Sequence, residues 1–552
     1  MQIYPFFDAQ SRNAPVHCHL AFDAFSSHIS DGVLRANISF SRAPRIITLT
    51  LPPSTMVNRS MRRLVPTMCV IALAFSSCAI FRPSGRPSDP IAALHYDIDQ
   101  VLADSIFVPA RTSIKVTSSG SKEVLYERDS KLLMRPASNM KLLTSAAALH
   151  VLGKDYRFRT SVYADTTVID SILVGNVYLK GFGNPDLKTA DLDTLVLQVK
   201  ALGVNRITGG VVADVTFFDN IYWGNGWNWD DEPSSDAPFI TPLSINDNCV
   251  KVSVSPGRSQ GDSLQVTVDP PSTYVSVVNK GRTVSDSVFQ RLRVSRLYME
   301  RLNTIIVEGE MLSGARPVER KLSVWKPEMY AATLFTEALQ RKGILVARGP
   351  ALGQVSLRSR EIASHLQGID STIINLNKVS DNLTAEMLLK TLDAVTNNVP
   401  GRSEGGIFVV NQFLSTMGID TMKYHIADGS GLSFYNLITG EMIVQLLEGM
   451  QHQTDVFPLF YESLPIAGVD GTIRNRMKGT LAEGNLRAKT GTISGVSSLS
   501  GYVHTLDGER LIFSMAMQNF IYPTRYYQRA QDKIGEILAG FSRFGLRSQP
   551  AQ

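Results

Sequence analysis

Ser138 and Lys141 stand three residues apart in the stretch PASNMKLLTSAAAL, where an apolar run typical of a helix begins. A spacing of three brings the two side chains to one face of a helix, within reach of each other. The first turn carries the positive end of the helix dipole, which disfavours the charged form of a lysine. A lysine with a destabilised charge beside a hydroxyl can act as a general base for a nucleophile. The alternative is that Ser138 caps the helix and Lys141 is solvated.

Ser-x-x-Lys is a weak pattern on its own, because the chain contains it again at residues 119–122. Gly120 and the clustered serines of this second copy lie between two β-rich runs, TSIKV and EVLYE. That arrangement predicts a hairpin turn and not a helix start. The chemistry of Ser138 therefore depends on whether the chain also supplies its partners.

An acylating serine also needs a proton relay and a cation for the carboxylate of its substrate. The stretch NKVSDNLTAEMLLK places Ser380 and Asn382 at a predicted helix start. The stretch LRAKTGTISG places Lys489, Thr490 and Gly491 in a predicted strand. Ser-x-x-Lys, Ser-x-Asn and Lys-Thr-Gly in this order are signature elements of the penicillin-recognising serine enzymes. Ser-x-Asn recurs elsewhere in the chain but Lys-Thr-Gly occurs once, so the ordered set carries the prediction.

Further segments extend the similarity beyond these motifs. KGFGNPDL, WNWDDEP, ADGSGLSFYNLIT and LPIAGVDGTIRNRM resemble segments of the D-alanyl-D-alanine carboxypeptidase/endopeptidase family, the class C low-molecular-mass penicillin-binding proteins of the penicillin-binding protein 4 type. The resemblance covers about residues 90–545 and includes a large insertion between the first two motifs. It implies an α/β (α+β) fold, in which a serine β-lactamase/DD-peptidase-like transpeptidase domain is split by a β-rich insertion.

The resemblance implies a role for each motif residue. Lys141, kept partly neutral by nearby Lys489 and the helix end, would take the proton of Ser138, which attacks the carbonyl between two D-alanines. The backbone N–H groups of Ser138 and Thr492 would form the oxyanion hole. Ser380 would relay the proton to the leaving amine, and Asn382 would bind Lys141 and the substrate backbone. The terminal carboxylate would be held by Lys489, Thr490, Gly491 and Thr492.

The implied partners are peptidoglycan peptides that end in D-Ala-D-Ala or are cross-linked, and β-lactam antibiotics. Water would release the acyl chain from Ser138, which gives carboxypeptidase or endopeptidase activity, whereas a β-lactam would acylate Ser138 and remain. No metal or organic cofactor is implied.

The resemblance also places residues around the diamino-acid side chain of the substrate. After DGSGLS the family usually has arginine and this chain has Phe434, so either another cation replaces it or the selectivity differs. Asp231 resembles the family acid that pairs with the free amine; its neighbour Asp230 is an alternative, and both acids would suit a solvated loop. Asp428 and Asp470 are expected to shape turns. Packing of the insertion is an alternative role for Trp223, Trp227 and Trp229.

Hydrophobic periodicity and turn signals predict the elements that position these residues. Helices are predicted in PIAALHYDIDQVLAD, within 376–450 and in YYQRAQDKIGEILAGF, and two strands flank an Asp507-Gly508 turn. Short alternating runs predict antiparallel strands over 156–360, with one clear helix in KPEMYAATLFTEALQRKGI. The predicted division is a DD-peptidase domain at 90–155 and 361–546, split at 156–360 by an inserted β-rich module with two subdomains.

Residues 61–78 resemble a lipoprotein export signal, with a charged start, an apolar stretch too short to span a bilayer, and small residues before Cys78. Cys78 would be lipidated; simple cleavage nearby by an ordinary signal peptidase is the alternative. An export signal belongs at the N-terminus, so residues 1–60 are predicted to be upstream sequence that precedes a start at Met61. Residues 79–89 read as a tether. The predicted location is the periplasm, with a membrane anchor.

Composition limits the other functions. The net charge of +5 on 552 residues is mild and has no basic block, so no nucleic-acid partner is predicted. No metal-ligand spacing of His and Cys is present, and Cys249 would be the only cysteine of the mature chain besides the anchor. Two competing functions remain: a β-lactamase or esterase on the same fold, which needs a route for fast deacylation, and a non-catalytic penicillin-binding or wall-binding protein.

Overall fold

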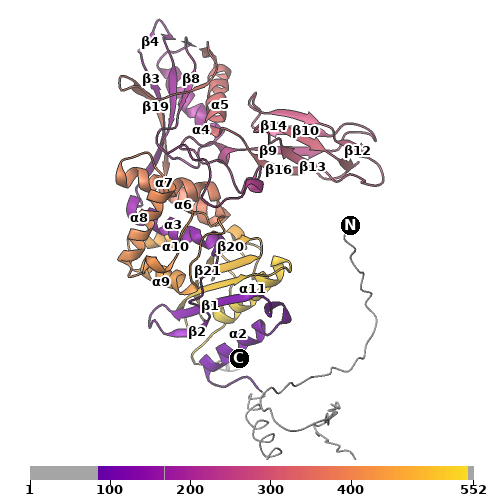
Figure 1. Cartoon of the computed structure of the whole chain (residues 1–552), viewed down its shortest axis with the longest axis vertical. Helices are drawn as coiled ribbons and strands as arrows, with labels where there is room; N and C mark the ends of the chain where they lie inside the picture. Colours follow the sequence, from indigo (N-terminus) through magenta and orange to yellow (C-terminus); the bar gives the residue numbers. More distant parts are fainter. Residues whose placement is uncertain (1–84, 167, 545–552) are drawn as a thin grey trace, which may run out of the picture. The chain divides into compact units, whose positions relative to one another are not determined.

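The computed structural model describes residues 85–166 and 168–544 (Figure 1). The described residues belong to one compact unit of the chain. The upstream segment 1–60, the signal 61–78 with Cys78, and the first part of the tether 79–89 lie outside the described residues, so these remain predictions. Within the described part, no helix combines the length and the apolar character needed to cross a membrane.

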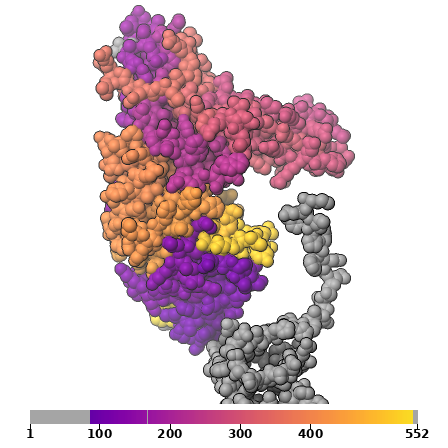
Figure 2. Space-filling model, viewed as in Figure 1, coloured from indigo at the N-terminus to yellow at the C-terminus, as the bar shows by residue number. Residues whose placement is uncertain are grey.

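Five antiparallel strands form the sheet that carries the Lys-Thr-Gly motif. In order they are β2 (Val124–Arg128), β1 (Arg111–Ser118), β22 (Arg510–Gln518), β21 (Val496–His504) and β20 (Arg487–Ile493). Pairing of β1 with β22 joins segments from opposite ends of the chain, which Figure 2 shows side by side in indigo and yellow. The hairpin predicted around residues 119–122 is confirmed as the connection between β1 and β2. Its Ser-x-x-Lys copy therefore lies in a turn.

Alternating side chains of this sheet enter two different cores, as the period of two along a strand requires. Leu499 and Phe513 lie in a core with α2 (Pro90–Leu102) and α11 (Thr524–Ala539). Tyr502 and Ile512 point to the opposite face and join a core formed mainly by helices. The predicted helices at both ends of the described chain are thus confirmed, and together they cover one face of the sheet.

Seven segments form the helical layer on the other face. Its centre is α3 (Met140–Leu152), whose first ten residues are all buried, as expected for a helix surrounded by protein. The others are α6 (Ile369–Asn375), a π-helical turn (Leu376–Ser380), α7 (Asn382–Asn397), α8 (Ser403–Thr416), α9 (Gly440–Gln451) and α10 (Phe457–Ser463). Helices predicted between 376 and 450 are confirmed.

The segment between α3 and α6 is rich in strands, as its alternating sequence predicts. The predicted antiparallel pairing holds only in part, because strands joined by a crossover, such as 177–181 and 211–214, pair in parallel. One five-stranded sheet has the order β18-β8-β6-β3-β19 and packs against two helices, α4 (Thr189–Ala201) and α5 (Pro327–Arg341). Its strands are β18 (Ala351–Leu352), β8 (Val211–Asp214), β6 (Val177–Gly181), β3 (Arg157–Ala164) and β19 (Arg360–Gly368). The helix α5 was predicted and α4 was not. The predicted module boundary at 360 falls on the first residue of β19, which pairs with β3.

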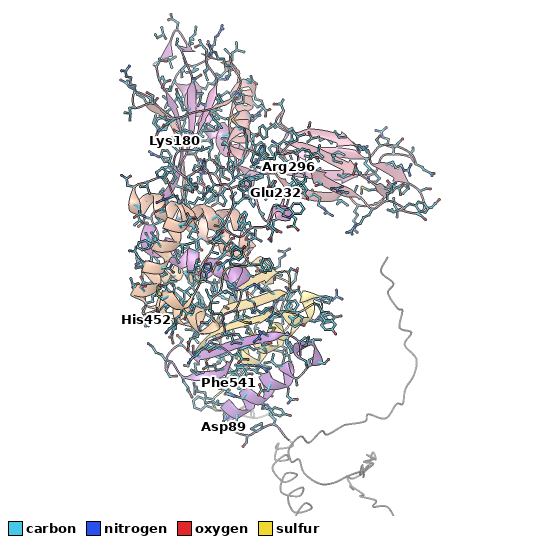
Figure 3. All side chains as sticks on the ribbon, in the orientation of Figure 1. Asp89, Lys180, Glu232, Arg296, His452 and Phe541 are labelled. Carbon is cyan, nitrogen blue, oxygen red and sulfur yellow. The ribbon has the colours of Figure 1, made fainter. Side chains whose placement is uncertain are left out.

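The remaining strands form smaller sheets in the same segment. A three-stranded sheet holds β10 (Gln265–Asp269), β9 (Cys249–Ser255) and β16 (Val318–Ser323). A second holds β11 (Ser276–Asn279), β14 (Thr304–Glu308) and β13 (Arg293–Arg296). Two-stranded and four-stranded sheets hold β12 (Arg282–Val284), β15 (Glu310–Leu312), β17 (Leu345–Val346), β7 (Arg206–Ile207), β5 (Ile172–Leu173) and β4 (Val168–Ile169). Arg296 of β13 forms an ion pair of 2.7 Å with Glu232; both residues are labelled in Figure 3.

Candidate active site

Ser138 lies in a short 3-10 turn (Ala137–Asn139) that leads into α3, and its side chain does not cap a helix. Instead, Lys141 Nζ donates a hydrogen bond of 2.9 Å to Ser138 Oγ. Lys141 is completely buried. The alternative of a capping serine beside a solvated lysine is therefore wrong, because the backbone turns before α3 and directs Ser138 toward the lysine.

Three acceptors surround the Lys141 ammonium, which matches the three protons that it can donate. Besides Ser138 Oγ, these are Asn382 Oδ1 at 2.6 Å and Ser430 O at 2.7 Å. Burial lowers the pKa of Lys141 to about 8, although nearby carboxylates oppose the shift. Burial is thus the largest cause of the lowered pKa, where the sequence suggested the helix end and Lys489. A lysine with this pKa is partly neutral near neutral pH.

Lys489 is a second fully buried lysine, on strand β20. Its Nζ donates 2.8 Å to Ser380 Oγ and 2.9 Å to the carbonyl of Thr490. Burial and the charge of Lys141 hold the pKa of Lys489 well below its ordinary value. The two serines of the motifs therefore each accept from a buried lysine whose proton is easily lost.

The backbone around both serines is strained. Ser380 ends the π-helical turn with a φ of 65°, and Ala137, next to Ser138, has a φ of 47°. Non-glycine residues rarely adopt this region, and such strain is typical of functional sites. Gly491 is required for another reason: a Cβ there would lie 2.6 Å from Pro136 O and 3.0 Å from Ser138 N. Because Gly491 has no Cβ, β20 can run directly beside the backbone of Ser138.

Ser138 and Ser380 line a small cavity of about 230 Å³. The residues that line it are Ser138, Ser380, Thr472, Arg476, Thr490, Thr492 and Gln528. A larger cleft of about 620 Å³ lies in the strand-rich segment, between residues such as Lys188, Asp247 and Lys321. No serine paired with a buried lysine lines that larger cleft, so the smaller cavity is the candidate active site. No cluster of three potential metal ligands is found among the described residues.

Comparisons with known proteins agree with this geometry. The profile of the D-Ala-D-Ala carboxypeptidase 3 (S13) family matches residues 94–539. A D-alanyl-D-alanine carboxypeptidase of Actinomadura sp. (strain R39) is 34% identical over 516 residues, 91% of each chain. The chain belongs to this carboxypeptidase family. Another relative, D-alanyl-D-alanine carboxypeptidase DacB of Haemophilus influenzae, is 27% identical over 71% of this chain and 82% of its own.

The fold of the S13 carboxypeptidases is also shared. The crystal structure of penicillin binding protein 4 from Haemophilus influenzae matches with a TM-score of 0.71 and 24% identity, over 81% of this chain and 99% of that chain. The same protein has been solved in complex with a β-lactam, and that structure matches with a TM-score of 0.67. The resemblance inferred from the motifs and the predicted α/β fold are confirmed. The chain is a peptidase of the hydrolase class.

A loop of the strand-rich segment completes the site of this S13 carboxypeptidase. Asn382 Nδ2 donates 2.6 Å to the carbonyl of Asp236, and Trp227 Nε1 donates 3.1 Å to Asp428. Trp227 also packs against a small buried cluster that includes residues of α7. Trp223 stacks on Trp325, so packing is confirmed as a role for both tryptophans. Trp229, by contrast, is 69% exposed.

The structure places Asp231 and Phe434 outside the residues that line the cavity. Asp231 accepts a hydrogen bond of 2.8 Å from the backbone N–H of Asn228 and so shapes its own turn. Its neighbour Asp230 is exposed. Phe434 lies beside a cation, Arg135, which has no motif signal in the sequence. The Arg135 guanidinium is 5.4 Å from the Phe434 ring, and Arg135 Nε donates a hydrogen bond of 3.3 Å to the Phe434 carbonyl.

The acids expected to shape turns do so. Asp428 accepts from the backbone N–H groups of Gly431 and Ser433 at 2.8 and 2.7 Å. Asp470 accepts from the N–H of Ile466 at 2.8 Å, and it also pairs with Lys378 at 2.7 Å. Sequence reasoning missed other residues at or near the site: Thr472, Arg476, Gln528, Ser430 and Glu386. Thr472 and Arg476 stand in the family-like segment LPIAGVDGTIRNRM and Ser430 stands in ADGSGLSFYNLIT, which were the available signals.

Proposed function

We propose that this chain is a serine-type D-Ala-D-Ala carboxypeptidase that works through an acyl-enzyme on Ser138. The observation that carries the proposal is the bond of 2.9 Å between Ser138 Oγ and the buried Lys141. Burial keeps a fraction of Lys141 neutral, and a neutral amine at this distance can accept the proton of the hydroxyl. Membership of the S13 family supports the substrate class.

In the first step neutral Lys141 takes the proton of Ser138, whose oxygen attacks the carbonyl between two D-alanines. The negative charge that develops on the carbonyl oxygen is stabilised by the backbone N–H groups of Ser138 and Thr492. When the C–N bond breaks, the leaving amine takes a proton relayed through Ser380, which Lys489 contacts. Water then attacks the ester, which frees the shortened peptide and restores Ser138.

The substrate has a free carboxylate beside the scissile bond. Lys489 and the hydroxyls of Thr490 and Thr492 would hold this carboxylate, since both threonines line the cavity and Gly491 brings their strand against Ser138. Asn382 joins Lys141 to the loop at Asp236, where it can also contact the peptide backbone. We propose peptidoglycan peptides as the substrate. Cleavage of cross-linked peptides would be an endopeptidase activity of the same site. Asp231 and Phe434, with Arg135 nearby, would contact the diamino-acid side chain.

The same proposal includes a place in the cell. The signal-like segment 61–78 supports export to the periplasm, with lipidation at Cys78 as the anchor and 79–89 as the tether. The peptidase domain would consist of 90–155 and 361–546, with the module 156–360 inserted. Mass determination of the protein purified from its membrane fraction tests the anchor, since lipidation removes the residues before Cys78 and adds acyl chains.

Release of D-alanine from a synthetic pentapeptide that ends in D-Ala-D-Ala tests the central activity. We expect release by the full chain and none by Ser138→Ala. A dimer of such peptides, joined through a D-Ala bond, tests endopeptidase activity in the same assay. Turnover of a penicillin without peptide cleavage would instead support a β-lactamase, and neither reaction would support a non-catalytic binding protein.

A further inference from the structure

Glu386 is a fully buried carboxylic acid for which the mechanism above has no role. It lies on α7, four residues after Asn382, so the two side chains project from the same face of the helix. Acids are rarely buried without a partner, because burial disfavours their charged form. The partners of Glu386 therefore indicate what it does.

Glu386 accepts hydrogen bonds from the residues of one loop. Its Oε1 accepts from Ser430 at 2.8 Å and from Gly429 at 3.0 Å, and its Oε2 accepts from Gly429 at 3.2 Å. The carbonyl of the same Ser430 accepts from Lys141 Nζ at 2.7 Å. On the other side of the loop, Thr144 Oγ1 donates 2.7 Å to the carbonyl of Gly429. Glu386 thus holds the peptide unit that holds the lysine.

A closed ring of contacts results. Lys141 bonds Asn382 at the start of α7, and Glu386 one turn later bonds the loop at Ser430, which returns to Lys141. Helix α7 therefore positions two of the three acceptors of Lys141: it provides Asn382 and holds Ser430 through Glu386. A displacement of Glu386 would move the Ser430 carbonyl and with it the Nζ atom that faces Ser138.

The charge of Glu386 acts on the same lysine. Lys141 is faced by four acids and one cation: Asp428, Asp381, Glu386, Asp236 and Lys489. The ionised form of each acid favours the ammonium form of Lys141. Burial, followed by the charge of Asp428, raises the pKa of Glu386 to about 7, so its ionisation changes in the range where the lysine works.

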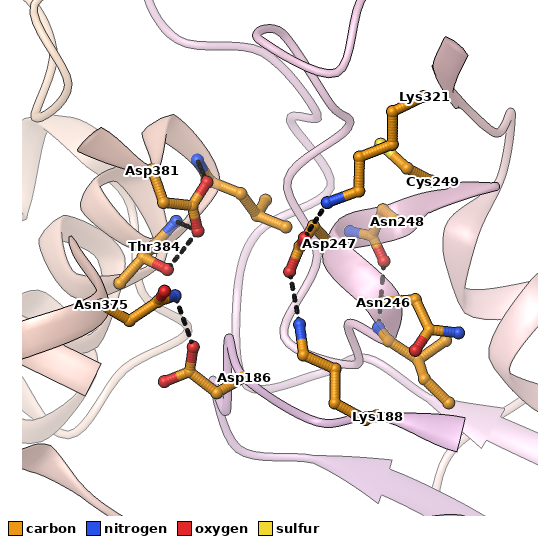
Figure 4. A network of polar contacts seen from close by, with 12 residues as sticks. Asp186, Lys188, Asn246, Asp247, Asn248, Cys249, Lys321, Asn375, Asp381 and Thr384 are labelled. Carbon is orange, nitrogen blue, oxygen red and sulfur yellow. Dashed lines mark hydrogen bonds and ion pairs between the residues drawn. The ribbon is translucent and has the colours of Figure 1, made fainter. Parts of the chain in front are cut away.

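Asp381, another of these acids, has a different environment. It caps α7 through the N–H groups of Leu383 and Thr384, and it faces Asp247, which lies between Lys188 and Lys321 (Figure 4). Burial, followed by the like charge of Asp247, raises the pKa of Asp381, so its environment differs from the loop that surrounds Glu386. Within the described part of the chain, Glu386 has no cation among its hydrogen-bond partners. It acts on Lys141 through the loop and through the electrostatic effect of its negative charge.

We propose that Glu386 is a positioning residue for the acylation step, which fixes the Ser430 carbonyl against Lys141 and controls the proton occupancy of the lysine. This inference rests on the proposed roles of Ser138 and Lys141. Because Glu386 acts through another residue, its loss changes the pH dependence of acylation as well as its rate. A merely structural role would lower stability without moving the pH profile.

Rates of acylation of the full chain by benzylpenicillin, measured from pH 5.5 to 9, test the inference. In Glu386→Gln the retained Oε1 can still accept from the loop, but the negative charge that favours the ammonium form of Lys141 is gone. We therefore expect the acid limb of the pH profile, where the acylation rate falls as Lys141 becomes protonated, to move to lower pH by about half a unit or more. In Glu386→Ala two buried N–H groups lose their acceptor, so we expect the plateau rate to fall about tenfold or more.

Asp393→Asn is the matched control. Asp393 is a buried acid on the same helix that accepts from the N–H of Arg402 at 2.8 Å, and it does not face Lys141. We expect its acid limb to coincide with that of the parent. A folded Glu386→Gln whose acid limb also coincides with the parent would overturn the inference.

If Glu386→Gln does not fold, Thr144→Val provides a second test, since it loosens the same loop and leaves every charge in place. We expect a plateau at least about threefold lower with an unchanged acid limb; an unchanged plateau would overturn the positioning role. Failure of the proposed function looks different. In that case the parent chain itself forms no adduct on Ser138, whatever residue occupies position 386.

Discussion

Two buried lysines and two serines form the core of the candidate active site, and burial lowers the pKa of both lysines. Lys141 and Lys489 are completely shielded from water, and each donates to a serine hydroxyl. Their lowered pKa values make proton transfer possible near neutral pH. The sequence indicated these residues by type, order and spacing. It could not indicate the depth of burial, which depends on helices and loops far away in the chain.

We expect acylation by a penicillin to depend on pH through Lys141. Below its pKa of about 8 the lysine is mostly ammonium and cannot accept the proton of Ser138, so the rate falls about tenfold per pH unit. Above that value the rate levels off. Stopped-flow or quenched mass measurements across pH 6–9 check the profile. A rate that is flat down to pH 6 would contradict the assigned base.

We expect Gly491→Ala to lower the acylation rate about a hundredfold, because its Cβ would collide with Pro136 O at 2.6 Å and push β20 away from Ser138. The measurement is the second-order rate constant for a penicillin. Gly120→Ala is the control, since its Cβ would meet nothing within 4 Å. Equal rates for the two variants would show that the close approach of the strand is unimportant.

At the scale of elements, the motifs lie where secondary structure changes. Ser138 precedes α3, Ser380 ends a π-helical turn before α7, and Lys489 lies on β20. The apolar runs of the sequence predicted helices at α3 and α7, and the strand β20 was predicted at the Lys-Thr-Gly motif. Sequence periodicity missed α4, although Leu192, Leu195, Val196 and Val199 form an apolar stripe, since short strands on either side dominated that region. The π-helical turn has no sequence signal of its own.

We expect Asp381→Ala to destabilise the protein by about 1 kcal/mol, since Asp381 caps α7 through two backbone N–H groups. Asp381→Asn keeps an acceptor oxygen and removes a charge that burial and Asp247 disfavour. Its free energy of unfolding should therefore equal or exceed that of the parent. Urea unfolding of both variants checks this, and equal losses in both would contradict the capping role.

At the scale of the whole molecule, the strand-rich segment contributes directly to the site. Its loop contacts Asn382, Asp428 and Lys390, three side chains that the peptidase helices and loops provide. No local sequence pattern reveals such contacts, because they join residues more than a hundred positions apart. The same reason explains why Arg135 near Phe434 and Glu386 behind Lys141 appear only in the structure.

We expect Asp219→Ala to cost about 3 kcal/mol of unfolding free energy, because it leaves Lys390 buried without its carboxylate. Lys390 Nζ donates 2.5 Å to Asp219, and its side chain is 1% exposed. Asp455→Ala is the control: it removes the partner of the exposed Lys154, and we expect no change there. Chemical denaturation measures both. Similar values for the two variants would contradict a buried ion pair between the segments.

The most direct test of the central claim is peptide mapping by tandem mass spectrometry after incubation of the full chain with benzylpenicillin. We expect a stable penicilloyl adduct on Ser138, absent from Ser138→Ala and strongly reduced in Lys141→Ala, because the attacking oxygen and its base are both required. An adduct on another residue, or the same adduct in Ser138→Ala, would contradict the account.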